Sequence, residues 1–385
     1  MIGGATTSRA HTAVKIAPQY DQGVLHVLDA SRSVTVVSSL LGTEKESLLG
    51  SVAKEYEGLR NQFNNKNKKD LVPYREAVVT KEYFDWKNYQ PVQPAFTGTK
   101  QLEDYDLGEI ARYIDWQPFF IAWEMHGKFP QLLSDPLIGK EATKLYEDAQ
   151  QLLAQLIREK WLQAKGVVGF WPAQKTAADT VLVKNDNAAV SLEFLRQQVK
   201  KAAGQPNLSL ADFISPENDF IGAFSVTIQG IEPHIKKFEA AHDDYNKIIL
   251  QALADRIAEA FAELLHERTR KEFWGYAKEE TLSNEQLISE AYSGIRPAPG
   301  YPACPDHTEK HKLFNLLGGE SATGIHLTES LAMYPAASVC GWYFANPASK
   351  YFGVGKIGKD QLENYAQRKG MRHEEAVKWL RPILD

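Results

Sequence analysis

The segment from Gly294 to Pro302 places an arginine on a backbone that has little freedom. Three prolines and two glycines lie within these nine residues, Gly-Ile-Arg-Pro-Ala-Pro-Gly-Tyr-Pro, and they impose an irregular but rigid course. Arg296 is therefore held in place, and its planar guanidinium can grip a carboxylate through two hydrogen bonds. The composition fits a binding loop and a proline-rich surface loop with a solvated arginine about equally well.

A single acid among aromatic residues is the second candidate. Asp115 stands in Tyr-Ile-Asp-Trp-Gln-Pro-Phe-Phe, residues 113–120. Aspartate is seldom buried without a partner, so a carboxylate in these surroundings suits a ligand ammonium or sulfonium group. On sequence alone its position before Pro118 favours the simpler alternative, a turn or helix N-cap aspartate.

A third candidate is the aromatic string Ser-Lys-Tyr-Phe-Gly-Val-Gly at residues 349–355. Tyr351 and Phe352 offer flat faces that can flank a base. The glycines match a dinucleotide-binding fingerprint only weakly, because no helix with a third glycine follows in register. The strand and turn signals favour an ordinary hairpin arm instead. The arms of that hairpin would be residues 338–344 and 351–357, with Asn346 and Pro347 between them.

Four polar residues share one face of a predicted long helix, because they are spaced by four, three and four positions. They are Glu259, Glu263, His266 and Arg270. The simplest interpretation is a solvated face with ion pairs inside the helix. The alternative is a polar face turned toward a partner or a ligand.

The segment from Cys304 to His311 has a spacing that a metal site could use, but it offers few ligands and no second paired-cysteine motif. We therefore expect helix-start residues here and no metal site. The chain also lacks a Gly-x-Ser-x-Gly elbow, a phosphate-binding Walker loop and a His-Glu-x-x-His motif. These absences disfavour the common hydrolase, nucleotidase and metalloprotease classes.

The helices and strands predicted around these residues indicate an α+β fold with an antiparallel sheet and surrounding helices. Apolar spacing predicts helices at residues 141–165 and 245–271, and a C-terminal helical region from 360 to 384 with a break at Gly370. Strands are expected at residues 167–172, 180–183 and 220–228, with a turn at 185–187.

Unlike the rest of the chain, the first 42 residues are predicted to be the end of an α/β unit. An apolar strand at residues 24–28 leads through a polar loop into a helix at 34–41. A lone strand and helix cannot build a parallel sheet, so we expect this segment to be an incomplete, Rossmann-like remnant. Residues 43–70 follow as a helical linker with a polar, mobile end, and residues 71–385 form the large domain.

Composition limits the classes of function. A net charge of -5 gives no basis for nucleic-acid binding, and no run of 18 apolar residues exists to span a membrane. The N-terminus lacks the pattern of a secretory signal. The two cysteines, Cys304 and Cys340, fit a reducing compartment, so we expect a cytoplasmic protein.

The three candidate segments together resemble a known family. Arg296 to Tyr301 is similar to the Arg-x-x-x-Gly-Tyr motif of the activation domain of cobalamin-dependent methionine synthase. Residues 113–120 and 350–352 resemble two further signature segments of that domain, in the same order and with similar separation. The resemblance covers roughly residues 70–385, and it is specific because three rare strings coincide.

The resemblance implies a methyltransferase context in which S-adenosylmethionine methylates cobalamin after cob(II)alamin has formed and an electron has been supplied. Arg296 would hold the ligand carboxylate, and Asp115 its amino group. Tyr351 and Phe352 would hold the adenosine end, beside Ala298. Tyr301 would act as the catalytic residue near the methyl group or the cobalt. The implied partners are the cobalamin-binding domain of the same enzyme and flavodoxin or a related flavoprotein.

Residues 2–42 resemble the last part of the family's cobalamin-binding domain. Gly3 and Gly4 are similar to the glycine-rich segment beside the corrin's nucleotide tail. The Asp-x-His-x-x-Gly motif that supplies the cobalt-ligating histidine is absent, as are the homocysteine and folate modules. We therefore expect a C-terminal fragment that cannot complete turnover alone. Methylcobalamin would be held mostly by the missing domain, and zinc only by the missing homocysteine module.

Two other classes compete with this interpretation. A stand-alone methyltransferase would show a doubly wound sheet with a glycine-rich loop after its first strand, and that pattern is missing. A non-enzymatic S-adenosylmethionine sensor or interaction module would share the binding residues, so the sequence leaves it open.

Overall fold

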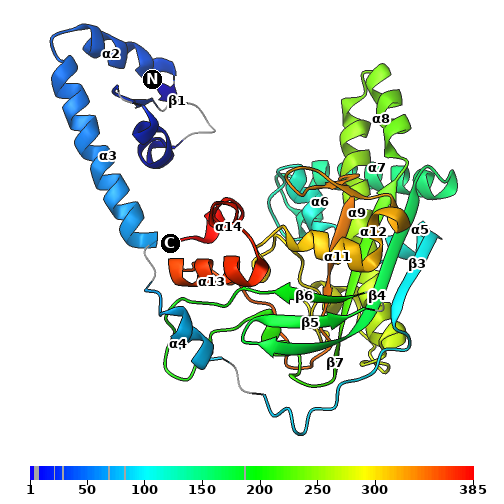
Figure 1. Ribbon diagram of the computed structural model, residues 1–385. Coiled ribbons are helices and arrows are strands. Elements are labelled where there is room, and N and C mark those ends of the chain that lie inside the picture. Colours follow the sequence, from blue (N-terminus) through cyan, green and yellow to red (C-terminus); the bar gives the residue numbers. More distant parts are fainter. Residues whose placement is uncertain (4–7, 21, 28–29, 68–69, 82–83, 186–187) are drawn as a thin grey trace. The chain divides into compact units, whose positions relative to one another are not determined.

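The computed structural model describes residues 1–385 apart from 4–7, 21, 28–29, 68–69, 82–83 and 186–187 (Figure 1). It divides into two compact units, one of residues 1–70 with Asp385 and one of residues 71–384. Gly4 and most of the turn predicted at 185–187 lie outside the described residues. Within the described residues, no helix is long and apolar enough to cross a membrane.

The N-terminal unit contains a short parallel strand pair. Strand β1 (Ile2–Gly3) pairs with β2 (His26–Val27), and helical turns connect them. A parallel pair requires such a crossover, so this unit is of the α/β type that the sequence indicated. The turns are α1 (Arg9–His11), a π turn (Thr12–Ile16) and a 3-10 turn (Ala17–Gln19).

Two helices complete this unit, α2 (Ala30–Leu41) and α3 (Lys45–Asn67). Tyr56 of α3 is buried, and its hydroxyl accepts a hydrogen bond from the backbone N–H of His26 at 2.9 Å. Helix α3 therefore packs on the N-terminal segment. The chain is helical as far as Asn67, which covers much of the stretch that the sequence suggested to be mobile.

The second unit is built on a six-stranded antiparallel sheet, which confirms the α+β prediction. Its strand order is β10-β7-β4-β5-β6, and β3 also pairs with β4. Strand β4 is long enough for β3 and β5 to follow one another along one edge while β7 covers the other. The strands are β3 (Gly98–Tyr105), β4 (Gln163–Ala177), β5 (Thr180–Lys184), β6 (Ala189–Glu193), β7 (Asp219–Gln229) and β10 (Ser338–Tyr343). A separate small hairpin joins β8 (His326–Leu327) to β9 (Met333–Tyr334).

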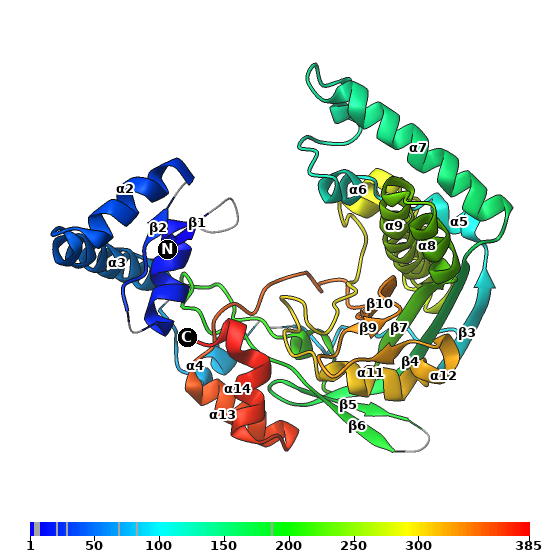
Figure 2. The same ribbon diagram turned by 90° about the horizontal axis from the view of Figure 1, so that it is seen from above.

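Helices cover both faces of the sheet, and alternate residues of β4 serve the two cores. Val168 and Phe170 pack with the long helix α9, whereas Val167 and Trp171 pack with α11. Figure 2 shows α9 and α11 on opposite sides of the sheet. The α9 side carries α5 (Leu107–Ala111), α6 (Gln117–Ala122), α7 (Gly139–Arg158), α8 (Ile231–Ala240) and α9 (Asp244–Arg268). The other side carries α11 (Glu309–Leu317) and α12 (Gly319–Thr323).

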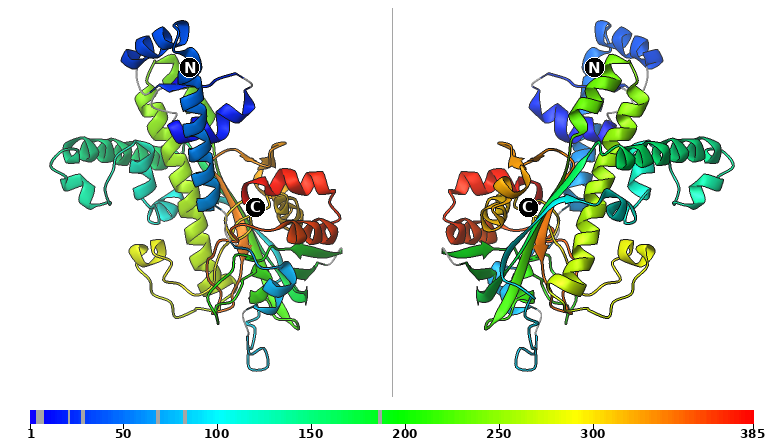
Figure 3. Two further views of the ribbon diagram at one scale, coloured as in Figure 1. Left: turned by 90° about the vertical axis from the view of Figure 1, so that its left-hand side faces the viewer. Right: turned by 90° about the vertical axis from the view of Figure 1, so that its right-hand side faces the viewer.

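The C-terminal helices form a third, smaller core. Helices α13 (Lys359–Lys369) and α14 (His373–Leu380), red in Figure 3, pack side by side. The break between them lies at Gly370, whose φ of +64° confirms the interruption predicted there. Short elements elsewhere are α4 (Tyr74–Val79), α10 (Asn284–Ile288), a π turn (Thr269–Phe273) and 3-10 turns at Gln131–Ser134, Leu210–Phe213 and Arg381–Ile383.

Two of the secondary-structure predictions are wrong. The helix predicted to reach residue 165 ends at Arg158, because Lys160 takes a left-handed φ of +51° and β4 begins at Gln163. Residues 351–357 do not form a hairpin arm beside β10. Their backbone bonds go elsewhere, from Val354 N–H to the carbonyl of Pro302 at 2.8 Å and from Ile357 N–H to that of Ile383 at 2.9 Å.

Candidate functional site

The loop from Gly294 to Pro302 runs along β10, in the place that the hairpin arm was expected to take. Ile295 and Phe344 exchange two backbone hydrogen bonds of 3.0 Å, and the N–H of Trp342 donates to the carbonyl of Pro297 at 2.9 Å. These bonds satisfy backbone groups at the edge of the sheet. They give Arg296 a defined place on a rigid support.

Two glycines shape the ends of this loop. Gly294 has a φ of +83° and Gly300 a φ of +93°, a region that favours glycine. A Cβ atom at Gly300 would lie 2.3 Å from the ring of His307, and one at Gly294 would lie 2.6 Å from the hydroxyl of Tyr276. Both positions therefore require glycine.

The aromatic segment at residues 349–355 is tied to this loop. The hydroxyl of Tyr351 accepts a hydrogen bond from the backbone N–H of Arg296 at 3.0 Å, and it lies 3.2 Å from the hydroxyl of Tyr292. The bond between Val354 and Pro302 adds a second link. Two segments that the sequence singled out separately thus form one structural unit.

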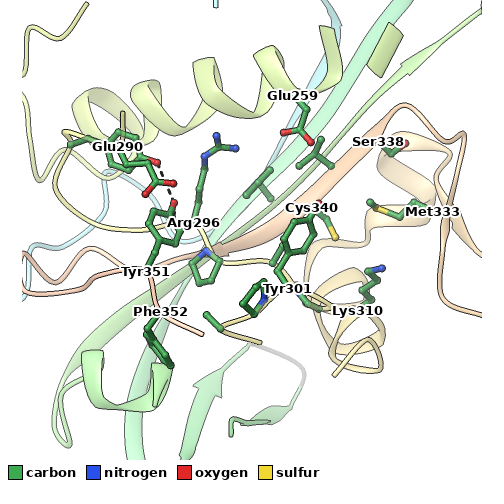
Figure 4. A pocket seen from close by; sticks show the side chains of 18 residues that line it. Glu259, Glu290, Arg296, Tyr301, Lys310, Met333, Ser338, Cys340, Tyr351 and Phe352 are labelled. Atoms are coloured by element: carbon green, nitrogen blue, oxygen red, sulfur yellow. Dashed lines mark hydrogen bonds between the residues drawn. The ribbon is translucent and has the colours of Figure 1, made fainter. Parts of the chain in front are cut away.

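Five of the predicted residues line one cavity of about 560 Å³, which is within the usual range for small-molecule sites (Figure 4). They are Arg296, Ala298, Tyr301, Tyr351 and Phe352. Residues that the sequence did not single out for this cavity also line it, among them Glu290, Tyr292, Lys310, Met333, Ser338 and Cys340. Glu259 lines the same cavity from α9.

Asp115 lines a neighbouring cavity of about 250 Å³ that shares Arg296, Glu259 and Glu290 with the larger one. The turn expected at Asp115 is confirmed, whereas its contact with a ligand cation stays a prediction. One carboxylate oxygen accepts a hydrogen bond from the N–H of Gln117 at 2.9 Å, as in a turn, and the side chain also borders the cavity. The charged groups around this cavity are four carboxylates and two guanidinium groups, from Asp115, Glu259, Glu263, Glu290, Arg256 and Arg296.

Arg296 is not a solvated side chain. Its Nη2 lies 2.6 Å from Oε2 of Glu263, and the two side chains are 19% and 9% exposed. Burial opposes the charge on the guanidinium, but Glu263 and the neighbouring tyrosines outweigh it and raise the pKa of Arg296 above its ordinary value. The arginine is therefore a permanent cation fixed between α9 and the loop.

The polar face of α9 is largely buried, so the prediction of a solvated face is wrong. Glu263 is 7% exposed, and His266 and Arg270 are completely buried. Arg270 binds Glu280 through Nε and Nη2, and burial lowers the pKa of His266 well below its ordinary value. The helical spacing placed Glu259 and Glu263 on one face of the helix, but it could not show that the loop at 294–302 covers them.

Tyr301 and Glu290 are solvent-exposed residues of the site. Tyr301 is 61% exposed, although it borders the cavity, so its ring lies at the opening. Partial burial raises the pKa of Glu290, and the carboxylate of Glu263 raises it further against the opposing effect of Arg296. Glu290 and Tyr292 belong to no motif that was recognised in the sequence.

Two further residues were predicted as binding residues. Gly3 is in strand β1 of the N-terminal unit, and Gly4 lies outside the described residues. The segment from Cys304 leads into helix α11, as expected, and Asp306 binds Tyr365 at 2.6 Å. Across the described part of the chain, no group of three histidines, cysteines or acids is placed to hold a metal ion.

Comparison with known proteins adds independent evidence. A family model described as the activation domain of vitamin B12-dependent methionine synthase matches residues 106–370. Among solved structures, the chain is similar to the crystal structure of the MetH reactivation domain bound to AdoHcy. The two are 48% identical with a TM-score of 0.78, and the match covers 82% of this chain and 98% of that one.

Proposed function

The chain belongs to the family of activation domains of vitamin B12-dependent methionine synthase, and we propose that its two neighbouring cavities bind S-adenosylmethionine as a methyl donor. The observation that carries the proposal is that Arg296, Tyr301 and Tyr351 line one cavity while Asp115 lines the next. The related reactivation domain was solved with AdoHcy, the demethylated form of this ligand.

Charge supports this ligand. S-Adenosylmethionine carries a carboxylate, an ammonium and a sulfonium group, so it is a net cation with one anionic end. Arg296 suits the carboxylate because a guanidinium can bind both of its oxygens. Asp115 and the neighbouring glutamates suit the two cations, and a cavity rich in carboxylates favours a positive ligand.

The remaining lining residues suit the adenosine end and the methyl group. Phe352 is partly buried and Tyr351 is fixed by its hydrogen bond to Arg296, so both rings can pack on a base at small entropic cost. Ala298 lines the same cavity, and its small side chain adds little bulk beside them. Tyr301, which is exposed at the opening, would face the acceptor of the methyl group.

The acceptor in this proposal is cobalamin, which a cobalamin-binding domain of the same enzyme would present and whose reduced cobalt supplies the nucleophile. Flavodoxin or a related flavoprotein would deliver the electron. The residues of this chain contribute by binding and orienting the donor and by leaving its methyl group open at Tyr301. The same proposal includes residues 1–42, in which Gly3 and Gly4 would contact the corrin's nucleotide tail.

Two experiments test the proposal. Calorimetric titration of the full chain with S-adenosylmethionine should show one saturable site. Adding a cobalamin-binding domain, cob(II)alamin and a one-electron reductant should then move a labelled methyl group from the donor to the corrin. Binding without transfer would favour the alternative, a non-enzymatic sensor or interaction module, and absence of binding would reject both.

A further inference from the structure

We propose that Glu263 is a positioning residue that holds the guanidinium of Arg296 in the orientation that receives the ligand carboxylate. The inference rests on the proposed function, because it assumes that the ligand has a carboxylate and that Arg296 binds it. Glu263 itself contacts the arginine, and its effect on the ligand is exerted through that contact.

The arginine is fixed at both ends. Its backbone N–H is bound by the hydroxyl of Tyr351, and its Nη2 is bound by Oε2 of Glu263 at 2.6 Å. An arginine side chain between these points has four rotatable bonds, and an unrestrained one would lose conformational entropy when a ligand ordered it. The ion pair orders the guanidinium before the ligand arrives, which reduces that cost.

The pair leaves donors for a second carboxylate. Among the described residues, Glu263 binds the guanidinium through Nη2 alone, and the buried Nε has no hydrogen-bond partner. An arginine has five N–H groups in a planar fork, so an acid on one side still leaves groups for another. The second oxygen of Glu263, Oε1, also has no partner in the described part of the chain.

Two neighbouring groups do not compete for Glu263. Arg270, in the π turn that follows α9, is bound by Glu280 at 2.7 to 2.9 Å. His266 is completely buried, and its pKa is lowered well below the ordinary value, so it does not present a second cation at neutral pH. The interaction of Glu263 is therefore directed to Arg296.

A competing interpretation predicts the opposite effect. If Glu263 occupied the part of the guanidinium that the ligand needs, the ligand would have to displace it, and removing its charge would tighten binding. The two interpretations differ in the sign of one measured change, so a single substitution separates them.

The test compares two ligands by calorimetric titration of the full chain. One is S-adenosylmethionine, and the other is its decarboxylated analogue, which keeps both cationic groups and lacks the carboxylate. Glu263→Gln should weaken binding of S-adenosylmethionine by about tenfold or more, and of the analogue by less than about twofold. In the background of Arg296→Ala, Glu263→Gln should have no further effect on S-adenosylmethionine, because the two residues act as one unit.

Controls keep the result interpretable. Glu109→Gln breaks a different ion pair to helix α9, the one between Glu109 and Arg268 at 2.7 Å. Neither residue of this pair borders either cavity, so the substitution should leave both affinities unchanged. Glu263→Asp keeps the charge but withdraws it by one methylene, and an intermediate loss is expected even if the glutamine variant folds poorly. Thermal unfolding is recorded for each variant.

The outcomes separate the inference from the proposed function. Tighter or unchanged binding of S-adenosylmethionine to Glu263→Gln overturns the positioning role. Equal weakening of both ligands also overturns it, since Glu263 would then attract the ligand cations directly. Wild-type protein that binds neither ligand rejects the proposed function itself.

Discussion

The hydroxyl of Tyr351 accepts the backbone N–H of Arg296 at 3.0 Å, although the two residues are 55 positions apart in the chain. This bond joins the segment proposed to hold the adenosine to the segment proposed to hold the carboxylate. Glu263 fixes the other end of Arg296 at 2.6 Å. In the proposed function, recognition of the two ends of the ligand would therefore depend on one connected set of contacts.

The substitution Tyr351→Phe removes the acceptor and keeps the aromatic ring. The net value of such a hydrogen bond is about 0.5–1.5 kcal/mol, so we expect S-adenosylmethionine affinity to fall by about two- to tenfold. Calorimetry measures the change. Tyr334→Phe is a suitable control, because Tyr334 is 49% exposed and borders neither cavity. An equal loss in both variants would contradict the role assigned to the Tyr351 hydroxyl.

Asp115→Asn tests the proposed contact to the ligand ammonium. Asparagine keeps an oxygen that can accept the N–H of Gln117, so the local turn should persist. Loss of a hydrogen bond to a charged group costs about 1.5 kcal/mol or more, which predicts at least about tenfold weaker binding of S-adenosylmethionine. 5′-Methylthioadenosine, which lacks the amino-acid end, should bind both proteins alike.

A matched control exists for this substitution. Asp135 also accepts a backbone N–H two residues ahead, from Leu137 at 2.8 Å, and it borders neither ligand cavity. Asp135→Asn should leave ligand binding unchanged. If both aspartate variants lose affinity to the same extent, the effect comes from turn structure and not from the ammonium contact.

Asp219 predicts a pH dependence of folding that is independent of the ligand. Burial raises the pKa of this carboxyl to about 6, although the backbone N–H groups of Ser215 and Phe220 donate to it. Its pKa in an unfolded chain is about 4. Between these values the folded protein holds a proton that the unfolded chain has released. The contribution of Asp219 to stability is therefore greatest below pH 4, and it falls by about 1.4 kcal/mol per pH unit until pH 6.

The measurement is urea unfolding of wild type and Asp219→Asn from pH 4 to pH 7. Because Asp212, Asp306 and Asp360 have lowered pKa values and act in the opposite direction, the difference between the two proteins is the relevant quantity. The wild type should lose about 2–3 kcal/mol relative to the variant over this range. A difference that does not change with pH would show that Asp219 titrates normally.

Much of the sheet and of the long helices was predictable because their signals are local. The strand expected at residues 220–228 is β7, and the helix expected at 245–271 corresponds to α9 and its terminal π turn. Apolar alternation and helical spacing follow from which side chains are buried, so they can be recognised in the sequence without knowledge of tertiary contacts. The glycines and prolines of the loop at 294–302 likewise predicted a defined backbone, and in the structure that backbone is hydrogen-bonded to the strand beside it.

The partners of that loop could not be predicted, because they are distant in sequence. Glu263 and Arg270 were expected to be solvated, but the spacing of a helix face says nothing about what covers it. The arm expected at 351–357 fails for a similar reason, since the loop around Ile295 already occupies that place beside β10. Glu290 and Tyr292 belong to no motif, and only the fold brings them to the cavity.

We propose that Arg296 binds the carboxylate of S-adenosylmethionine, and calorimetric titration of Arg296→Ala with this ligand measures the contribution of that contact. Losing one partner of a buried, charged contact costs about 2–5 kcal/mol, which weakens binding by about one to more than three orders of magnitude. Arg296→Lys should recover only part of the loss, because an ammonium group cannot reproduce the planar fork.

Circular dichroism must show that the variants fold, since Glu263 loses its partner when Arg296 is removed. We expect a folded Arg296→Ala protein with strongly weakened binding of S-adenosylmethionine and nearly normal binding of the decarboxylated analogue. A folded Arg296→Ala protein that binds S-adenosylmethionine as tightly as the wild type would contradict it.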